Sequence, residues 1–285
     1  MIVARTKREL GEHLDTPRRE GGTIGLVPTM GSLHDGHLLL LRAARERCDF
    51  VVMSLFVNPA QFGRGEDLES YPRDEPRDLE LAEGAGVDVV YAPPVDEVYP
   101  EGIATTVEVG GGLTDVLDGA PEGRGPGHFR GVTTVVAKLL NTVGPDIAFF
   151  GQKDAQQAVV IRRMARDLDF PVEIQVLPTV REPDGLAMSS RNAYLGPEDR
   201  QRALALSRAL RAAESVAASG ETRSEPALAA ARTELEAAGI EPEYLEARDA
   251  ETLMPAASLN GRPVLIAVAA RVGQARLIDN TLIGV

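Results

Sequence analysis

Two of the chain's four histidines, His34 and His37, lie three residues apart between an apolar strand-like segment and an apolar helix-like one. The stretch reads VPTMGSLHDGH and is followed at once by LLLL. If a strand ends near Met30 and a helix begins near Gly36, both imidazoles lie beside a helix N-terminus, where unpaired backbone N–H groups favour an anion. Imidazoles there can donate hydrogen bonds to phosphate oxygens and stabilise charge that grows during phosphoryl or adenylyl transfer. An isolated H-x-x-H pair is more often a helix cap or a pair of metal ligands, so the neighbouring sequence has to decide.

Three other segments carry side chains suited to phosphate or carboxylate binding. GQKD places Lys153 beside Asp154, MSSRN places two serines before Arg191, and NPAQF contains Gln61. A lysine can stabilise negative charge in a transition state, and serine hydroxyls with an arginine can clamp phosphates. Each segment also has a structural interpretation, as a solvated lysine at a helix N-terminus, a turn with an N-cap, and a surface glutamine.

Alternating strand-like and helix-like patterns must position these residues. Strand-like runs at 23–29, 50–57, 87–92 and 146–150 alternate with helical patterns at 36–47, 79–84 and 133–143. The strands are continuously apolar, which predicts burial on both faces and therefore a parallel sheet covered by helices, a doubly wound (Rossmann-like) α/β domain. After about residue 180 the pattern changes to helices at 198–218 and 225–239 and strands at 244–247, 264–272 and 274–279, which predicts a smaller α+β domain. We therefore expect two domains, 1–180 and 181–285.

Composition limits the class of protein. The chain has 43 acidic and 30 basic residues and a formal net charge of −13, which opposes binding to nucleic acid. Its apolar runs are far shorter than the roughly 20 residues that a membrane helix needs, and charges near the N-terminus leave no signal-peptide core. We expect a soluble cytoplasmic protein without a membrane partner. The single cysteine, Cys48, allows no internal disulfide and is expected to fill a core position.

The surroundings of the histidines carry a family resemblance. T-M-G-x-L-H-x-G-H resembles the HIGH signature of the adenylate-forming nucleotidyltransferase superfamily, and MSSRN resembles the KMSKS-like loop that accompanies it. Further segments are FVNPAQF, YPR, PGHF-x-GV, FFGQKD-x-QQ and ARVGQARLIDN. Together they resemble the pantoate–β-alanine ligase (pantothenate synthetase) family over the whole chain.

The resemblance implies a reaction and a set of site residues. ATP and pantoate would form pantoyl adenylate with loss of pyrophosphate, and the β-alanine amine would then displace AMP. The first domain would bind ATP and pantoate and catalyse the reaction, the second would be a lid, and the protein would be a homodimer. The implied catalytic residues are His34, His37, Lys153 and Arg191. The implied ATP-binding residues are Met30, Gly31, His34, His37, Gly151, Lys153, Asp154, Met188, Ser189, Ser190 and Arg191. The implied pantoate-binding residues are Met30, Gln61 and Gln157.

Mg²⁺ is expected with ATP, and the resemblance makes Asp78 the candidate protein ligand. The chain departs from the family pattern beside it, because Arg77 occupies a position where relatives often carry an acid. In GRGPGHF, Gly125 replaces the usual arginine before the proline, so Arg124 and His128 are weak counterparts, and GRGPG is expected to be a flexible loop. Ala155 replaces an aromatic residue near Lys153.

Two other functions fit part of the sequence. One is a nucleotidylyltransferase of the same superfamily that passes AMP to a phosphate acceptor, although such enzymes usually have one α/β domain and lack the Gln61 and Gln157 pair. The other is a catalytically silent nucleotide-binding protein, against which the presence of His34, His37 and Lys153 together argues. Pyrophosphate release that requires both pantoate and ATP would distinguish the ligase from both.

Overall fold

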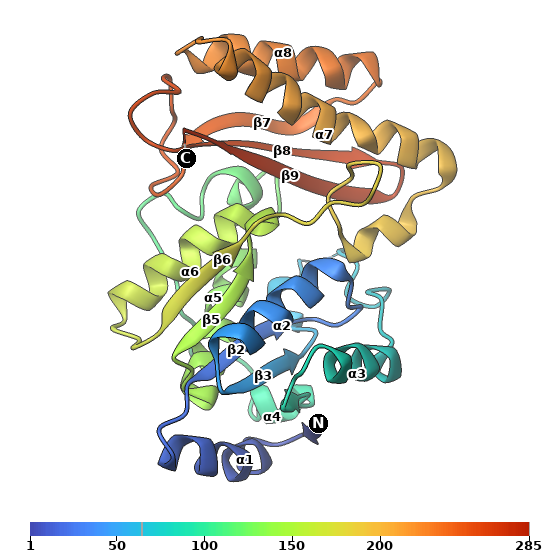
Figure 1. The fold of residues 1–285 in the computed structure, drawn as a ribbon. Helices are drawn as coiled ribbons and strands as arrows, with labels where there is room; N and C mark the ends of the chain where they lie inside the picture. Colours follow the sequence, from blue (N-terminus) through green and yellow to red (C-terminus); the bar gives the residue numbers. More distant parts are fainter. Residues whose placement is uncertain (64, 285) are drawn as a thin grey trace. The chain divides into compact units, whose positions relative to one another are not determined.

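The computed structural model describes residues 1–63 and 65–284, and this part of the chain forms two compact units (Figure 1). The first unit comprises Met1–Val109, Pro126–Gly151 and Val160–Pro178, and the second comprises Gly110–Gly125, Gln152–Val159 and Thr179–Val285. The two-domain division at residue 180 stays a prediction.

A parallel sheet forms the centre of the first unit. Its six strands, counted over the described residues, have the order β1-β4-β3-β2-β5-β6. The strands are β1 (Ile2–Ala4), β2 (Ile24–Thr29), β3 (Phe50–Leu55), β4 (Val89–Tyr91), β5 (Ile147–Gly151) and β6 (Glu173–Leu177). All pairings between them are parallel. The predicted doubly wound α/β domain is therefore confirmed.

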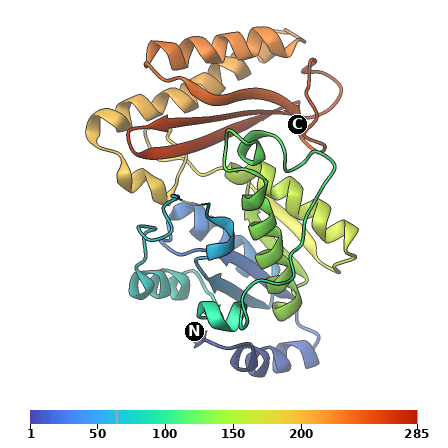
Figure 2. The ribbon, with the colours of Figure 1, turned by 180° about the vertical axis from the view of Figure 1, so that it is seen from behind.

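Helices cover both faces of this sheet. The helices and 3₁₀ turn are α1 (Lys7–Arg19), α2 (Asp35–Arg47), η1 (Pro59–Gln61), α3 (Glu75–Gly84), α4 (Val95–Val98), α5 (Pro126–Val143) and α6 (Ala155–Asp167). Helix α2 lies in front of the sheet in Figure 1, and α5 lies in front in the reverse view of Figure 2, so they cover opposite faces. The core between sheet and α2 includes the fully buried Val27, Leu41 and Phe149.

The start of α5 corrects one prediction. The sequence predicts a loop at GRGPG, and residues 123–125 do lie outside any helix or strand, but Pro126 begins the helix and Gly127 lies in its first turn. The physical reason is that proline fits the first helical turn, where a backbone N–H would have no partner inside the helix.

The predicted small α+β region is confirmed in the second unit. Strands β7 (Pro242–Asp249), β8 (Val264–Val272) and β9 (Ala275–Ile283) pair antiparallel in that order. Helices α7 (Pro197–Ala218) and α8 (Ser224–Ala237) pack against this sheet through a core that includes Leu206, Leu235 and Ile266. Three 3₁₀ turns complete the unit, η2 (Leu117–Gly119), η3 (Gln152–Asp154) and η4 (Ser190–Tyr194).

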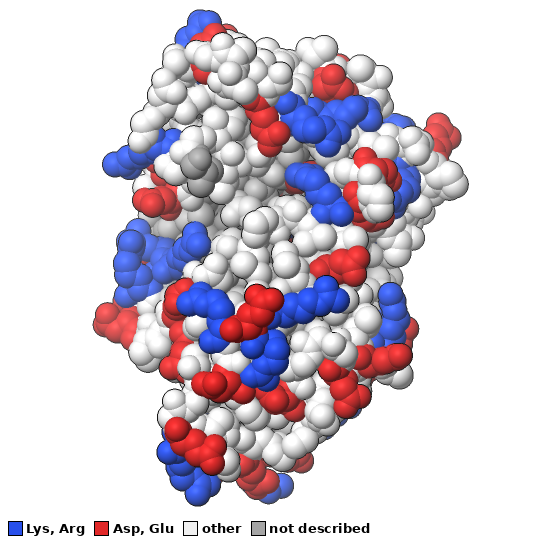
Figure 3. Space-filling view, viewed as in Figure 1, with Lys and Arg blue, Asp and Glu red and all other residues white. Residues whose placement is uncertain are grey.

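The charged surface and the buried cysteine agree with the expectations from composition. Basic and acidic side chains are interspersed over the face drawn in Figure 3. Among the residues described, no helix has the length and apolar character needed to cross a bilayer. Cys48 is buried as expected, and burial raises the pKa of its thiol, so it packs as a neutral group.

Candidate active site

The sheet of the first unit changes direction of winding between β2 and β5. β2 pairs with β3 along its whole length, from Ile24 to Thr29, but with β5 only at Gly25 and Leu26. Pro28 has no N–H to donate, so β2 cannot extend a full ladder on both sides. The two strands therefore part toward their carboxyl ends, which is the position where doubly wound sheets bind ligands. The segments that follow these strands are MGSLHDGH and QKD.

The two histidines cap helix α2, and each does so through the Nδ1 atom of its ring. His34 is the N-cap residue, and its Nδ1 accepts a hydrogen bond from Gly36 N at 3.1 Å. His37 Nδ1 accepts from His34 N at 3.3 Å, and the two ring centroids are 4.1 Å apart. Because Nδ1 of each ring acts as an acceptor, the proton of each neutral imidazole is assigned to Nε2 from its partners. Each ring can therefore present an Nε2–H donor at a helix N-terminus, and the capping and phosphate-binding interpretations are compatible.

The loop between β2 and α2 is held by a buried carboxylate. Gly31 and Ser32 have φ values of +85° and +52°, in the left-handed region. The Asp78 side chain on α3 is 1% exposed and accepts hydrogen bonds from Ser32 N at 2.8 Å and Leu33 N at 2.7 Å. A Cβ atom at Gly31 would lie 2.8 Å from Asp78 Oδ2, so this approach requires glycine. Asp78 thus fixes the backbone that leads into His34.

The described residues offer Asp78 as a candidate metal ligand but no cluster that could hold a metal ion by itself. Among the described residues, no three His, Cys, Asp or Glu side chains are grouped to hold a metal ion. The candidate ligand Asp78 already receives two backbone N–H groups, and Arg77 brings a positive charge next to it in sequence. A carboxylate in this setting is suited to fixing a loop, and its assignment as a metal ligand stays a prediction.

Gln61 lies at the end of the η1 turn, in a network of buried polar groups. It is 7% exposed, its Oε1 accepts from Asn58 Nδ2 at 3.1 Å, and its Nε2 lies 3.2 Å from Met30 Sδ. Asn58 Oδ1 accepts from the Tyr99 hydroxyl at 2.9 Å, and burial raises the pKa of Tyr99 to about 12, which keeps this phenol a donor. The amide of Gln61 is therefore oriented by its neighbours, with its NH₂ directed to Met30. Sequence reasoning missed Asn58, whose signal was an Asn before a proline at the start of a turn.

Helix α5 packs directly on the η1 turn. A Cβ atom at Gly131 would lie 2.6 Å from Gln61 Cα, so the helix backbone reaches this distance only because position 131 has no side chain. His128, one turn earlier, places Nδ1 2.8 Å from Gln61 O. The glycine and histidine of GHFRG thus both fix the backbone of Gln61.

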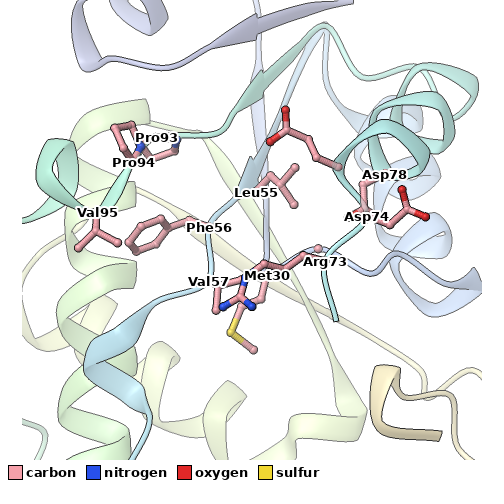
Figure 4. A pocket seen from close by; sticks show the side chains of 12 residues that line it. Met30, Leu55, Phe56, Val57, Arg73, Asp74, Asp78, Pro93, Pro94 and Val95 are labelled. Carbon is pink, nitrogen blue, oxygen red and sulfur yellow. The ribbon is translucent and has the colours of Figure 1, made fainter. Parts of the chain in front are cut away.

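A cavity of about 270 Å³ lies at the carboxyl ends of β2 and β3 (Figure 4). Met30, Leu55 and Phe56 line it together with the first residues of α3 and α4. The guanidinium of Arg73 at its edge donates to the backbone carbonyls of Leu68, Glu69 and Tyr71, so it supports the preceding loop. Met30 and Asp78 both line this cavity, within the first unit.

The remaining predicted residues belong to the second unit, apart from Gly151 at the end of β5. Lys153 lies in η3, with its Nζ 3.9 Å from Asp154 Oδ1, and Gln157 lies in the first turn of α6. Ser189 is the N-cap of η4, and its Oγ accepts from Arg191 N at 3.3 Å. This pairing confirms the turn and N-cap expected of MSSRN without testing its role toward phosphates.

The segment before MSSRN is a hydrogen-bonded turn. Gly185, at φ +95°, donates its N–H to Glu182 O, and Met188 N donates to Val180 O at 2.9 Å. Asn192 Nδ2 donates to Glu182 Oε1 at 2.7 Å and Ala187 O at 3.1 Å, which ties the two ends together. Asp184 and Gly185 form the tip of this turn. Met188, Ser190 and Arg191 follow directly from it.

The predicted site residues thus form two groups. One group lies at the carboxyl edge of the parallel sheet in the first unit and consists of Met30, Gly31, His34, His37, Gln61, Asp78 and Gly151. The other belongs to the second unit and consists of Lys153, Asp154, Gln157, Met188, Ser189, Ser190 and Arg191. The parallel sheet, its switch point and the histidine-capped helix define a protein of the doubly wound α/β class.

Comparison with known proteins identifies the family. The family model described as Pantoate-beta-alanine ligase matches residues 2–282. A pantothenate synthetase of Moorella thermoacetica is 54% identical over 286 residues, which cover 100% of this chain and 99% of that protein. The crystal structure of pantothenate synthetase from Thermus thermophilus has a TM-score of 0.92 and 50% identity over 99% of both chains. A Francisella tularensis pantoate-beta-alanine ligase, crystallised with beta-gamma ATP and beta-alanine, has a TM-score of 0.81 and 30% identity, covering 99% of this chain and 97% of that one. The chain belongs to the pantoate–β-alanine ligase family, which confirms the amide-forming ligase assigned from its motifs.

Proposed function

We propose that this chain condenses pantoate with β-alanine in two steps driven by ATP. The Francisella tularensis relative, crystallised with an ATP compound and beta-alanine, supports both ligands for this chain. A carboxylate oxygen of pantoate attacks the α-phosphorus of ATP, and pyrophosphate leaves. The neutral amine of β-alanine then attacks the carbonyl carbon of pantoyl adenylate, loses a proton, and AMP leaves with the C–O electron pair. The adenylate is needed because a free carboxylate is a poor electrophile.

The observation that carries this proposal is that Nδ1 of both His34 and His37 accepts a hydrogen bond from a backbone N–H. With Nδ1 of each ring used by a backbone N–H, Nε2–H of each ring is the donor for ATP phosphate oxygens. The N-terminus of α2 adds its partial positive charge, and Met30 and Gly31 present backbone to the substrate. These groups offset phosphate charge before and during adenylyl transfer.

Gln61 and Gln157 bind pantoate in this proposal. A neutral amide can donate to a carboxylate and accept from a hydroxyl, so it suits a hydroxy acid. The fixed orientation of the Gln61 amide, set by Asn58, supports this role because an amide already held in place loses little freedom on binding.

The second unit supplies the other phosphate ligands. Lys153 stabilises the charge that develops at the α-phosphate, and Ser189, Ser190 and Arg191 hold the β- and γ-phosphates. Asp154, 3.9 Å from the Lys153 ammonium, limits where that ammonium lies and is available to the ribose hydroxyls. Gly151 and Met188 present backbone to the nucleotide.

Mg²⁺ enters this proposal as an ion bound to ATP phosphates. The described residues provide no three-carboxylate or histidine cage for it, which suits a hard cation that keeps its phosphate and water ligands. When bound, it neutralises phosphate charge. The chain's own residues perform the other roles proposed above, which are to bind the substrates and to stabilise the transition state.

His34→Asn and His37→Asn separate helix capping from phosphate binding. The Oδ1 atom of asparagine lies one bond beyond Cγ, as Nδ1 of histidine does, so both variants keep an acceptor for the backbone N–H. The short amide does not reach the position of the imidazole Nε2–H. We expect unchanged thermal melting and a fall in kcat/KM for ATP of about 100-fold for each, as for removal of a transition-state donor. Steady-state kinetics and calorimetry measure the two effects. Unchanged activity would show that the histidines serve only as caps.

The reaction itself is tested by mass spectrometry. Purified protein with ATP, Mg²⁺, pantoate and β-alanine should yield pantothenate and AMP, and omission of β-alanine should leave pantoyl adenylate on the protein. Pyrophosphate release without pantoate, with AMP transferred to a phosphate acceptor, would favour the nucleotidylyltransferase. ATP binding without any product would identify a silent nucleotide-binding protein.

A further inference from the structure

A buried asparagine on β9 holds the backbone at Lys153. Asn280 is 5% exposed, and its Nδ2 donates to Gln152 O at 3.0 Å and to Lys153 O at 2.9 Å. Its Oδ1 accepts from Gln152 Nε2 at 3.1 Å. The donors and the acceptor of this one amide are therefore all directed at the η3 turn.

An asparagine suits this position for chemical reasons. Its NH₂ carries two hydrogens on one nitrogen, so it can satisfy two consecutive carbonyls, and its short side chain has few rotamers to fix. An aspartate would place negative oxygen against both carbonyls, and an alanine would leave them without this donor, which costs free energy when the carbonyls are buried. The sequence alone shows none of this, because Asn280 is far from GQKD in the chain.

The residue before Asn280, Asp279, anchors the turn that leads into MSSRN. Asp279 is 3% exposed, and its carboxylate accepts from Arg181 Nη1 at 2.6 Å and Nη2 at 3.0 Å. Asp279 Oδ1 also accepts from Asn280 N at 2.8 Å. The backbone of Arg181 forms a β-bridge with Ala187, directly before Met188. Since successive side chains of a strand point to opposite sides, Asp279 and Asn280 hold one segment each.

We propose that Asn280 is a positioning residue for Lys153 in adenylate formation, an inference that rests on the proposed function. Lysine has a long side chain with several rotatable bonds, so the place of its ammonium depends on where its backbone is fixed. A displacement of about 1 Å at a reacting centre can cost about 100-fold in rate. Asn280 acts through the carbonyls of Gln152 and Lys153 and touches no substrate.

The test compares Asn280→Ala with Gln152→Ala as its matched control. Gln152→Ala removes only the bond to Asn280 Oδ1 and keeps the donor on both carbonyls, so we expect kcat within about 3-fold of the unchanged protein. Asn280→Ala should lower kcat about 30-fold, with KM for ATP and pantoate changed less than about 3-fold, because positioning matters most in the transition state. Equal rates for the two variants would overturn the proposal.

A double-mutant cycle shows whether Asn280 acts through the lysine. If it does, Asn280→Ala should cause no further loss when Lys153 is already Ala, whereas additive losses would contradict the proposal. If Lys153→Ala keeps full activity, the lysine role in the proposed function is wrong and this inference falls with it. If Lys153→Ala is impaired and Asn280→Ala is not, the proposed function stands and only the inference fails.

Asn280→Asp provides an independent readout should the alanine variant not fold. The two side chains have nearly the same size, but the ionised carboxylate has no donor for the carbonyls, and protonation restores one O–H donor. We expect kcat relative to the unchanged protein to recover as the pH is lowered, within the pH range in which both proteins remain folded. If kcat of Asn280→Asp equals kcat of the unchanged protein over the whole pH range, the positioning role is overturned.

Discussion

Lys153→Ala is expected to lower kcat for pantothenate formation about 1,000-fold, the size of effect seen when a preorganised charge is removed from a transition state. ATP should still bind, because the other proposed phosphate ligands, in His34, His37 and the MSSR segment, remain. Steady-state kinetics and calorimetric titration with ATP measure these two quantities separately. The reason for the selective effect is that a cation at the α-phosphate gains interaction energy only as pyrophosphate departs.

Two variants serve as controls for this lysine. Lys138→Ala removes a lysine of α5 whose Nζ lies 5.6 Å from the centre of the Tyr99 ring, and it should leave kcat unchanged. Lys153→Arg keeps the charge but replaces a compact ammonium with a planar guanidinium, so activity should be recovered only in part. If ATP affinity collapses in Lys153→Ala while kcat persists, the lysine binds the ground state and does not stabilise the transition state.

Asp78→Ala is expected to lower the free energy of unfolding by about 4 kcal/mol. It leaves two backbone N–H groups, of Ser32 and Leu33, without their buried acceptor, and each such loss costs about 1–3 kcal/mol. For a unit of this size the melting temperature should fall by about 10 °C. Chemical denaturation and calorimetry measure the change, and kcat should also fall because the freed loop carries His34.

Asp74→Asn is the matched control, since it removes an acid from the same helix while keeping an N-cap acceptor for Arg77 N. We expect its stability to change by less than about 0.5 kcal/mol. The Mg²⁺ concentration needed for half-maximal rate in Asp78→Asn distinguishes the two roles of Asp78, and it should equal that of the unchanged protein if Asp78 only fixes the loop. A stable Asp78→Asn variant that needs much more Mg²⁺ would instead identify Asp78 as a metal ligand.

Much of the fold was predictable because local signals agreed with tertiary structure. The continuous apolar runs of β2, β3 and β5 marked a buried parallel sheet, and the ends of α2 and α7 were located to within a residue. β1 and β6 were missed. β1 has only three residues, and β6 is a half-buried edge strand with Glu173 and Gln175 among its apolar residues, so neither shows the pattern of a buried strand.

The candidate site was predictable as a set of residues but not as a set of contacts. The spacing of His34 and His37 on a helix start put the two rings together, whereas the use of both Nδ1 atoms by the backbone emerged only from the structure. Asp78, Asn58 and Asn280 work through hydrogen bonds to distant parts of the chain. A single sequence gives no local sign of such contacts, because only the folded chain brings the side chain and its distant partner together.

We also expect the short pairing between β2 and β5 to influence the order in which the sheet folds. Strands β1 to β4 all lie before residue 92, so their part of the sheet can pair while the rest of the chain is still being synthesised. The other part joins through Gly25 and Leu26, which must meet Ile147 and Ala148 from far along the chain. Closing so long a loop is entropically costly and slow. Strand pairing between β2 and β5 involves only two residues of each strand, so it offsets little of that cost. We therefore expect the edge that carries the histidines to be completed late, after most of the sheet beside it has already formed.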